Sequence, residues 1–365
     1  MNPPGTTARS SAAGGGEPLT YAAAGVDIGA GEQAVTLMGP AVASTARPEV
    51  IGGIGGFGGL FALPAGYRSP VLVASTDGVG TKLMVAVQAG RLGTIGVDLV
   101  AMCVDDLVCQ GAEPLFFLDY QVWGHLDPEA VAAIMGGIAE GCRQAGCAIL
   151  GGELAEHPGQ FPPGEMDLAG FAVGVVERDR ILGPSGANPA RPGDALVGLH
   201  SGGLRSNGYS LARAALFGGG RGQLDDEAWP GAGCSLADEL LRPSIIYAPA
   251  VLALLRRLDV HAVAHITGGG LPGNLPRALP PGVDALLQPG SWPVPPVFAA
   301  VQAAGGIDDA EMTKTFNMGL GMVVALPPEQ ARDAVALLGS LGFEAGEVGR
   351  VVAGEGRCLM RPPAA

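Results

Sequence analysis

The sequence predicts an α+β fold with two mixed α/β domains, and three observations lead to this prediction. The chain has 365 residues, of which 48% are hydrophobic, so it can bury one large core or two of ordinary size. Apolar strand-like runs and helix-like segments are mixed along the chain without strict alternation. A stretch rich in Pro, Gly and Arg at 178–193 interrupts this pattern, which then restarts. We therefore predict an N-terminal domain at 19–178 and a C-terminal domain at 179–365.

The individual elements follow from local patterns. Residues 1–18 are small, polar and rich in Gly and Pro, so we predict a disordered tail. Asp127 before Pro128 is typical of a helix start, and this helix is predicted to run to about Gln144. The other predicted helices are 81–111 with a break near Gly90 to Gly93, 206–217, 243–257 and 328–340. The predicted strands are 71–77, 115–122, 147–151, 168–176, 195–200, 261–266, 283–288, 319–325 and 343–352.

Composition argues against several classes of function. The net charge of −14 disfavours binding to nucleic acid or to anionic lipid, although a small anionic substrate is compatible with a local positive pocket or a metal ion. No apolar run is long enough to span a bilayer and no secretion signal begins the chain, so we expect a cytoplasmic protein. The six cysteines form no CxxC pair, which predicts buried thiols in a reducing compartment and no zinc site.

The clearest signal of chemistry is the segment TDGVGTK at 76–82. A strand delivers Asp77 into a turn where Gly78, Gly80 and Thr81 leave N–H groups free for phosphate, and Asp77 suits magnesium. Lys82 follows, and only two of the 21 basic residues in the chain are lysine. We predict that it contacts phosphate; the competing interpretation is an ordinary turn with a surface lysine. The GxxxxGK spacing of a Walker A loop is absent.

Acidic residues on an apolar helix suggest a second part of the site. Asp98, Asp105 and Asp106 lie in the segment 97–107, where buried carboxylates need a counter-charge or a metal. For Asp98 an ion pair with an arginine such as Arg143 explains the charge equally well. Glu153 follows two glycines at the end of another predicted strand, and we expect it to join Asp77 and Asp106 around magnesium.

Two glycine-rich segments, 53–58 and 268–273, match GxGxxG but lack the context of a dinucleotide site. We interpret them as anion-binding or substrate-covering loops, with Gly56, Gly58, Gly268 and Gly269 as candidates.

Ser206 and Asn207 open a predicted helix directly after Arg205, which either meets a phosphate or lies in solvent. His265 is interpreted as a packed core histidine. Lys314 is a weaker site candidate by the same scarcity argument as Lys82.

Long stretches of the chain, in order from Tyr21 to about residue 352, match one enzyme family. They are AGVDIGAG at 24–31, RPEVIGGIGGFGGLFALP at 47–64, TDGVGTKL at 76–83, IGVDLVAMCV at 95–104, QGAEPLFFLDY at 110–120, IAEGC at 138–142, AGFAVGVVE at 169–177, SNGYSL at 206–211, HITGGG at 265–270 and TFNMGLGM at 315–322. In these stretches the chain resembles the aminoimidazole ribonucleotide synthetases, also called phosphoribosylformylglycinamidine cyclo-ligases.

The resemblance implies ATP-dependent closure of formylglycinamidine ribonucleotide to aminoimidazole ribonucleotide, with magnesium as cofactor, by phosphorylation of the formyl oxygen. It implies a homodimer whose N-terminal halves, expected to be ferredoxin-like, contribute strands to an intersubunit barrel near the nucleotide. The implied catalytic residues are Lys82, Asp106 and Arg205. The implied metal ligands are Asp77, Asp105, Asp106 and Glu153. The implied ATP- or substrate-binding residues are Asp27, Gly56, Gly58, Gly78, Gly80, Thr81, Ser206, Asn207, Gly268, Gly269 and Asn317.

The chain departs from the family at three positions. The family usually has Asn where this chain has Asp105, Thr where it has Leu154, and His where it has Arg205. Two alternatives follow: a relative that uses ATP to activate another amide or acid substrate, and a non-catalytic paralogue that binds nucleotide. Intact Asp77, Lys82, Asp106 and Glu153 favour an enzyme.

Overall fold

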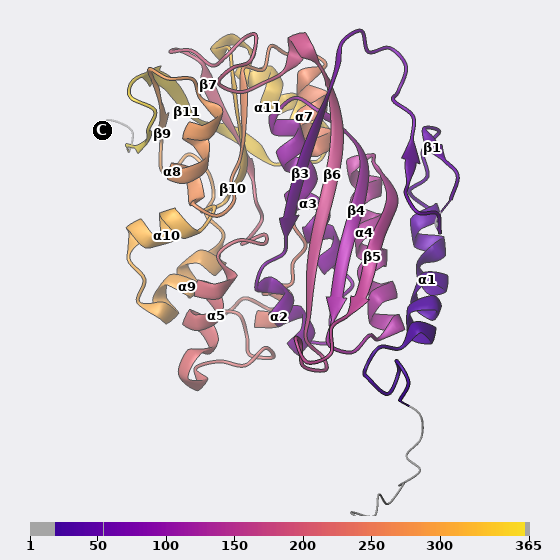
Figure 1. Ribbon diagram of the computed structural model, residues 1–365. Helices are drawn as coiled ribbons and strands as arrows, with labels where there is room; N and C mark the ends of the chain where they lie inside the picture. The colour runs from indigo at the N-terminus through magenta and orange to yellow at the C-terminus, as the bar shows by residue number, and fades with distance from the viewer. Residues whose placement is uncertain (1–18, 54, 362–365) are drawn as a thin grey trace, which may run out of the picture.

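Two main β-sheets, one from each half of the chain, organise the structure (Figure 1). It is a computed structural model that describes residues 19–53 and 55–361, so the predicted disordered tail lies outside the described residues. The first sheet has the strand order β3-β6-β4-β5, the second has the order β12-β9-β11-β7-β10-β8, and β1 and β2 form a separate hairpin. Helices pack around both sheets, which confirms a mixed α+β fold.

The first sheet is antiparallel except for the parallel pair β4 and β5, which α4 connects. Its chain order is β3, α2, α3, β4, α4, β5, β6, which differs from the ferredoxin-like βαββαβ order, so that expectation is wrong. The strands are β1 (Val50–Ile51), β2 (Leu60–Phe61), β3 (Pro70–Gly78), β4 (Glu113–Trp123), β5 (Ala148–Glu156) and β6 (Met166–Glu177). The helices are α1 (Ile28–Ala43), α2 (Lys82–Gln88), α3 (Ile95–Cys109) and α4 (Pro128–Ala145).

Local capping explains where α4 begins and ends. The side chain of Asp127 accepts hydrogen bonds from the N–H groups of Glu129 and Ala130, as its sequence predicted. The helix ends at Gly146, whose φ of 73° is left-handed and suits glycine. Helix α1 was not predicted; it lies beyond the β5 edge of the sheet and packs on α4 (Figure 1).

The second sheet is antiparallel except for the parallel pair β9 and β12. Its strands are β7 (Ala195–His200), β8 (Ala262–His265), β9 (Val283–Leu287), β10 (Leu320–Leu326), β11 (Ala345–Ala353) and β12 (Cys358–Met360). The α-helices are α5 (Tyr209–Phe217), α6 (Leu236–Leu240), α7 (Ala248–Leu255), α8 (Gly270–Asn274), α9 (Pro296–Gly305), α10 (Asp309–Thr315) and α11 (Ala331–Ser340). Short 3-10 helices span Arg178–Arg180, Gly218–Gly220, Leu275–Ala278 and Pro328–Gln330.

Helix α3 joins the two halves. It packs against β3, β4 and β6 of the first sheet and also against α7 and β8 of the second half. Most of its residues are buried, including Asp98 and Asp105. One continuous hydrophobic core therefore contains residues from both halves of the chain. Within the described part of the chain, no helix has the length and apolar character needed to cross a membrane.

Candidate functional site

Lys82 is buried in the interior, at the first turn of α2. Its ammonium nitrogen forms an ion pair with Asp98 Oδ2 at 2.7 Å, and it donates hydrogen bonds to the carbonyls of Arg205 at 3.0 Å and Arg242 at 2.7 Å. The side chain is fully inaccessible, so these protein groups surround the ammonium. Burial lowers the pKa of Lys82, and the neighbouring Asp98 acts in the opposite direction. The geometry thus gives no support to a phosphate contact by Lys82, and the partner of Asp98 is this lysine rather than an arginine.

Asp105 and Arg205 form a second buried ion pair. Arg205 Nη2 donates to Asp105 Oδ2 at 2.8 Å, and both side chains are essentially inaccessible. The other carboxylate oxygen accepts the N–H groups of Tyr247 and Ala248 at the start of α7. Burial raises the pKa of Asp105, and the guanidinium of Arg205 opposes this shift. Both oxygens are therefore occupied, which argues against the expected role of Asp105 in metal binding.

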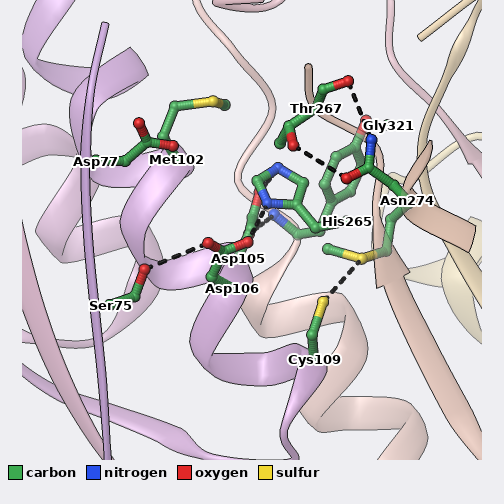
Figure 2. A network of polar contacts seen from close by, with 12 residues as sticks. Ser75, Asp77, Met102, Asp105, Asp106, Cys109, His265, Thr267, Asn274 and Gly321 are labelled. Atoms are coloured by element: carbon green, nitrogen blue, oxygen red, sulfur yellow. Dashed lines mark hydrogen bonds and ion pairs between the residues drawn. The ribbon is translucent and has the colours of Figure 1, made fainter. Parts of the chain in front are cut away.

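Asp106 faces a different environment, at a cleft between the two halves of the chain (Figure 2). Its Oδ1 lies 2.8 Å from His265 Nδ1, and its Oδ2 accepts a hydrogen bond from Ser75 Oγ at 3.3 Å. Burial raises the pKa of Asp106, but the hydrogen bonds from His265 and Ser75 act together with nearby positive charge such as that of Arg277, and the pKa lies below its usual value. The side chain of Asp106 remains 45% exposed, so a charged carboxylate is presented to a cavity of about 350 Å³ that Asn274 and Arg277 also line.

Asp77 lies at the end of β3, close enough to Asp106 for the two carboxylates to interact electrostatically. Burial raises the pKa of Asp77, as does the charge of Asp106, while the N–H of Gly78 acts in the opposite direction. The charges of the two carboxylates therefore influence each other, and a metal ion shared between them stays a prediction. The sequence interpretation dismissed His265 as a packed core residue; it is buried, but its ring contacts Asp106 at this cleft.

The turns at 78–81 and 206–210 come together from opposite halves of the chain. Thr81 Oγ1 and Ser210 Oγ are 3.0 Å apart, and a Cβ added to Gly80 would lie 3.8 Å from the carbonyl oxygen of Ser206. The hydroxyl of Ser206 is buried and has no hydrogen-bond partner among the described residues. A buried polar atom without a partner is uncommon in native structures, and a bound water or ion is one explanation of it.

Asn207 extends this group towards the second glycine-rich loop. Its Nδ2 contacts Met102 Sδ at 3.4 Å, and a Cβ added to Gly268 would lie 3.5 Å from its Oδ1. Gly269 has a left-handed φ of 97° just before α8. Gly268 and Asn207, both predicted to bind ligand, therefore lie next to each other.

Asn317 has a structural role in this arrangement. Its Nδ2 donates to the carbonyls of Gly203 and Leu204, and its Oδ1 accepts from Ser201 Oγ and the N–H of Gly319. All of these partners are protein groups, so the predicted ligand contact by Asn317 has no free polar atom to make it, and the side chain fixes the turn that precedes Arg205.

A separate pocket of about 690 Å³ lies between α1, the loop after β1 and the β4–β5 edge. Gly56, Gly58 and Glu153 line it. Asp119 and Gln121, which the sequence analysis missed, project from β4 into the same region. Burial raises the pKa of Asp119 to about 6, against the hydrogen bond that Gln121 Nε2 donates at 2.9 Å. Gln121 Oε1 is buried without a partner in the described structure, so this pocket too offers an unused polar atom.

Glu153 does not join Asp77 and Asp106. Residues 77, 170, 119 and 152 pair across the four strands, which places Asp77 and Glu153 on opposite edge strands about 14 Å apart. Residues that pair across the sheet share one face, so Asp77 and Gly152 lie on the same face. Side chains alternate along a strand, so Glu153 points to the opposite face. Around the described residues no group of three or more His, Cys, Asp or Glu could hold a metal. The predicted three-carboxylate cluster is therefore wrong within one chain.

Asp27 has a local role at the other end of this region. Its side chain accepts a hydrogen bond from the N–H of Ala30 and so caps α1, and its own N–H donates to Glu156 at 2.6 Å. Asp27 is exposed, so a ligand contact by this residue stays a prediction.

Comparison with known proteins assigns both halves of the chain to one family. Residues 65–176 match the N-terminal domain of the AIR synthase related proteins, and residues 191–359 match their C-terminal domain. The chain is 55% identical over 339 residues to a phosphoribosylformylglycinamidine cyclo-ligase of Myxococcus xanthus, covering 92% of this chain and 97% of the relative. It is 52% identical over 337 residues to the protein of the same name in Geobacillus kaustophilus, covering 92% and 96%.

Solved structures with the same fold are more distant in sequence. A hydrogenase maturation protein HypE in complex with ATP has a TM-score of 0.65 at 19% identity, with 91% of each chain covered. A thiamine-monophosphate kinase from Stenotrophomonas maltophilia has a TM-score of 0.62 at 20% identity, with 89% of this chain and 96% of that chain covered. The fold, the two matched domains and the high identity over nearly the whole chain agree, and the chain therefore belongs to the AIR synthase related protein family.

Proposed function

We propose that this protein closes the ring of formylglycinamidine ribonucleotide to give aminoimidazole ribonucleotide, using ATP, in purine biosynthesis. The observation that carries the proposal is 55% identity over 92% of the chain to a relative with the name of this cyclo-ligase. The cleft between the two halves is lined by Asp106, and Asp77 lies within electrostatic range of Asp106, which gives the reaction a site with charged groups.

In the proposed reaction the formyl oxygen takes the γ-phosphoryl group of ATP, and ADP leaves. An amidine nitrogen then attacks the activated carbon, the carbon–oxygen bond breaks, and inorganic phosphate departs as the imidazole closes. Such chemistry depends on positioning and charge neutralisation more than on a protein nucleophile. The N–H groups of the turns at 78–81 and 206–210 suit phosphate oxygens, and the unpartnered hydroxyl of Ser206 is available as a further donor.

Two carboxylates at this cleft suit magnesium. Asp77 on β3 and Asp106 on α3 influence each other electrostatically, and both keep carboxylate oxygens that other groups do not saturate. Magnesium is commonly held by one or two carboxylates together with substrate phosphates, so a pair is sufficient. Asp77 and Asp106 would hold the ion, which would neutralise developing charge on the transferred phosphoryl group. Asp105 and Glu153 are left out of this assignment.

Surface features support a homodimer. Ser75 and Asp77 face α3, so alternate residues such as Leu72 face the other way, onto the open side of the first sheet. Leu72, Tyr120 and Phe171 are 59%, 39% and 39% exposed on strands β3, β4 and β6. Large apolar side chains exposed together on a sheet favour burial against a second copy. We propose that two copies pair through this face into the intersubunit barrel.

The 690 Å³ pocket beside α1 is our proposed location for part of the nucleotide, because its glycine-rich loop, apolar walls and unpartnered Gln121 Oε1 suit a flat heteroaromatic ring.

A cytoplasmic location agrees with the proposed pathway and with six cysteines that are all unpaired.

A turnover assay with formylglycinamidine ribonucleotide, ATP and magnesium tests the function. We expect equal amounts of aminoimidazole ribonucleotide, ADP and phosphate. Isothermal titration with the ribonucleotide and an ATP analogue separates the alternatives. Binding of the analogue without binding of the ribonucleotide would indicate a relative with another substrate, and binding of both without product would indicate a non-catalytic paralogue.

A further inference from the structure

Arg205 occupies an unusual position in the fold. It has a φ of 64°, a left-handed conformation that is unfavourable for a residue other than glycine, and its side chain is buried between the two halves of the chain. Tertiary contacts must hold it there. These contacts also determine which atoms the guanidinium can reach, and Arg205 does not line the cavity at Asp106.

The guanidinium is held in one orientation by several contacts. Asp105 accepts from Nη2 at 2.8 Å and supplies the counter-charge, and the carbonyl of Ile245 accepts from the same nitrogen at 3.1 Å. The guanidinium carbon lies 4.8 Å from the centre of the Tyr247 ring. Asp105 is itself fixed by two N–H groups at the start of α7. With Nη2 fixed in this way, Nη1 points at the ring of His265.

The contact between Arg205 and His265 decides where the ring carries its hydrogen. Nη1 of Arg205 lies 2.7 Å from Nε2 of His265. A guanidinium has only donors, so Nε2 must present its lone pair. The hydrogen of the neutral ring then sits on Nδ1, which lies 2.8 Å from Oδ1 of Asp106. Asp105, Arg205, His265 and Asp106 therefore form a chain in which each hydrogen bond fixes the direction of the next.

We propose that Arg205 is a positioning residue that holds His265 as the Nδ1–H tautomer and thereby fixes the carboxylate of Asp106 at the reaction cleft. With Oδ1 occupied by the ring, the second oxygen, which Ser75 contacts at 3.3 Å, is the one that remains for substrate or ion. If the donor at Nε2 were lost, the ring hydrogen could move there. Nδ1 would then turn a lone pair towards Asp106, and the two groups would separate.

The inference rests on the proposed function for its effect on turnover, whereas the tautomer can be measured without turnover. The chain has five histidines, so long-range ¹H–¹⁵N correlation spectra of histidine-labelled protein can resolve each ring. His265→Gln identifies the signals of His265. We expect the native protein and Arg205→Lys, which also has only donors, to show hydrogen on Nδ1 and a bare Nε2. In Arg205→Met we expect this pattern to be lost.

Removing Arg205 alone leaves Asp105 buried and unpaired, so the double variant Arg205→Met/Asp105→Asn guards against misfolding. His261 is the matched control, because it is buried and its Nδ1 lies 2.7 Å from Asp194, away from this chain of contacts; its signals should not change. In turnover assays we expect the double variant to lose roughly 10–100-fold in kcat with little change in the KM for ATP, as for other residues that orient a functional group. We expect Arg205→Lys to retain most of kcat.

Two results would overturn the proposal: hydrogen on Nε2 of His265 in the native protein, or an unchanged ring in the folded double variant. A native protein that shows the expected tautomer yet makes no product would instead count against the proposed function.

Discussion

Replacement of Lys82 by methionine distinguishes a buried structural lysine from a phosphate ligand. Methionine fills a similar volume but removes the charge from a pair in which both Lys82 and Asp98 are fully inaccessible and 2.7 Å apart. Removing one partner of a buried pair generally costs about 3–5 kcal/mol of unfolding free energy. Asp98 keeps two hydrogen bonds, from the N–H and the hydroxyl of Ser244, so we expect the lower end, about 3 kcal/mol.

The assay combines urea denaturation with titration of a non-hydrolysable ATP analogue. We expect Lys82→Met to lower the unfolding free energy while the folded fraction binds the analogue with nearly native affinity. In Lys82→Met/Asp98→Asn neither charge remains buried, so the double variant should lose less stability than the sum of the single changes, with a coupling of the order of 1–3 kcal/mol. Lys314→Met is the matched control, because Lys314 is exposed at the end of α10 and its loss should leave stability nearly unchanged. Native stability in Lys82→Met together with a large loss of analogue affinity would refute this reasoning.

Three further predictions concern the pocket, the dimer and the metal. Burial raises the Asp119 pKa to about 6, so the folded state loses stability as the pH rises from about 4 to about 6. Asp119→Asn should therefore raise the unfolding free energy by up to about 3 kcal/mol at pH 7.5 and by little at pH 4, and equal effects at both pH values in denaturation experiments would contradict this. Phe171→Glu should shift the protein towards monomer in sedimentation. The control Leu341→Glu, at an exposed leucine away from the open sheet face, should leave the dimer intact, and a dimer unaffected by Phe171→Glu would place the interface elsewhere. Asp106→Asn should raise the magnesium concentration needed for half-maximal turnover by at least about tenfold, with Glu153→Gln as the comparison, and the reverse ranking in a magnesium titration would reject the carboxylate pair.

Local patterns were sufficient to predict much of the fold. The strand at 71–77 and the helix that begins after Asp127 have clear alternation and capping, and both lie within two residues of the prediction. Helix α1 was missed because its sequence contains two early glycines and an internal Pro40, which local rules read as loop. Its stability comes from packing on α4, which a single segment does not reveal.

The site was predicted less completely because its geometry depends on contacts far apart in the chain. The scarcity of lysine led to a predicted phosphate contact for Lys82, but its partners are protein groups from residues 98, 205 and 242. Glu153 ends a strand much as Asp77 does, yet their separation depends on strand order, which places β3 and β5 at opposite edges. The link between Arg205 and Asp105 joins positions 100 residues apart, although each was noticed separately as a departure from the family.

Helix α3 also limits how this protein can be divided or rearranged. Its aspartates reach the second half at three successive levels: Asp98 at Ser244, Asp105 at Arg205 and Asp106 at His265. A chain cut between residues 178 and 179 would expose two incomplete surfaces, one with Asp105 deprived of its cation and the other with Arg205 deprived of its counter-ion. A single inserted residue within the helix would rotate every later aspartate by about 100° and break the second and third contacts together. Helix α3 must therefore keep its register as well as its residue types for both halves to pack on it.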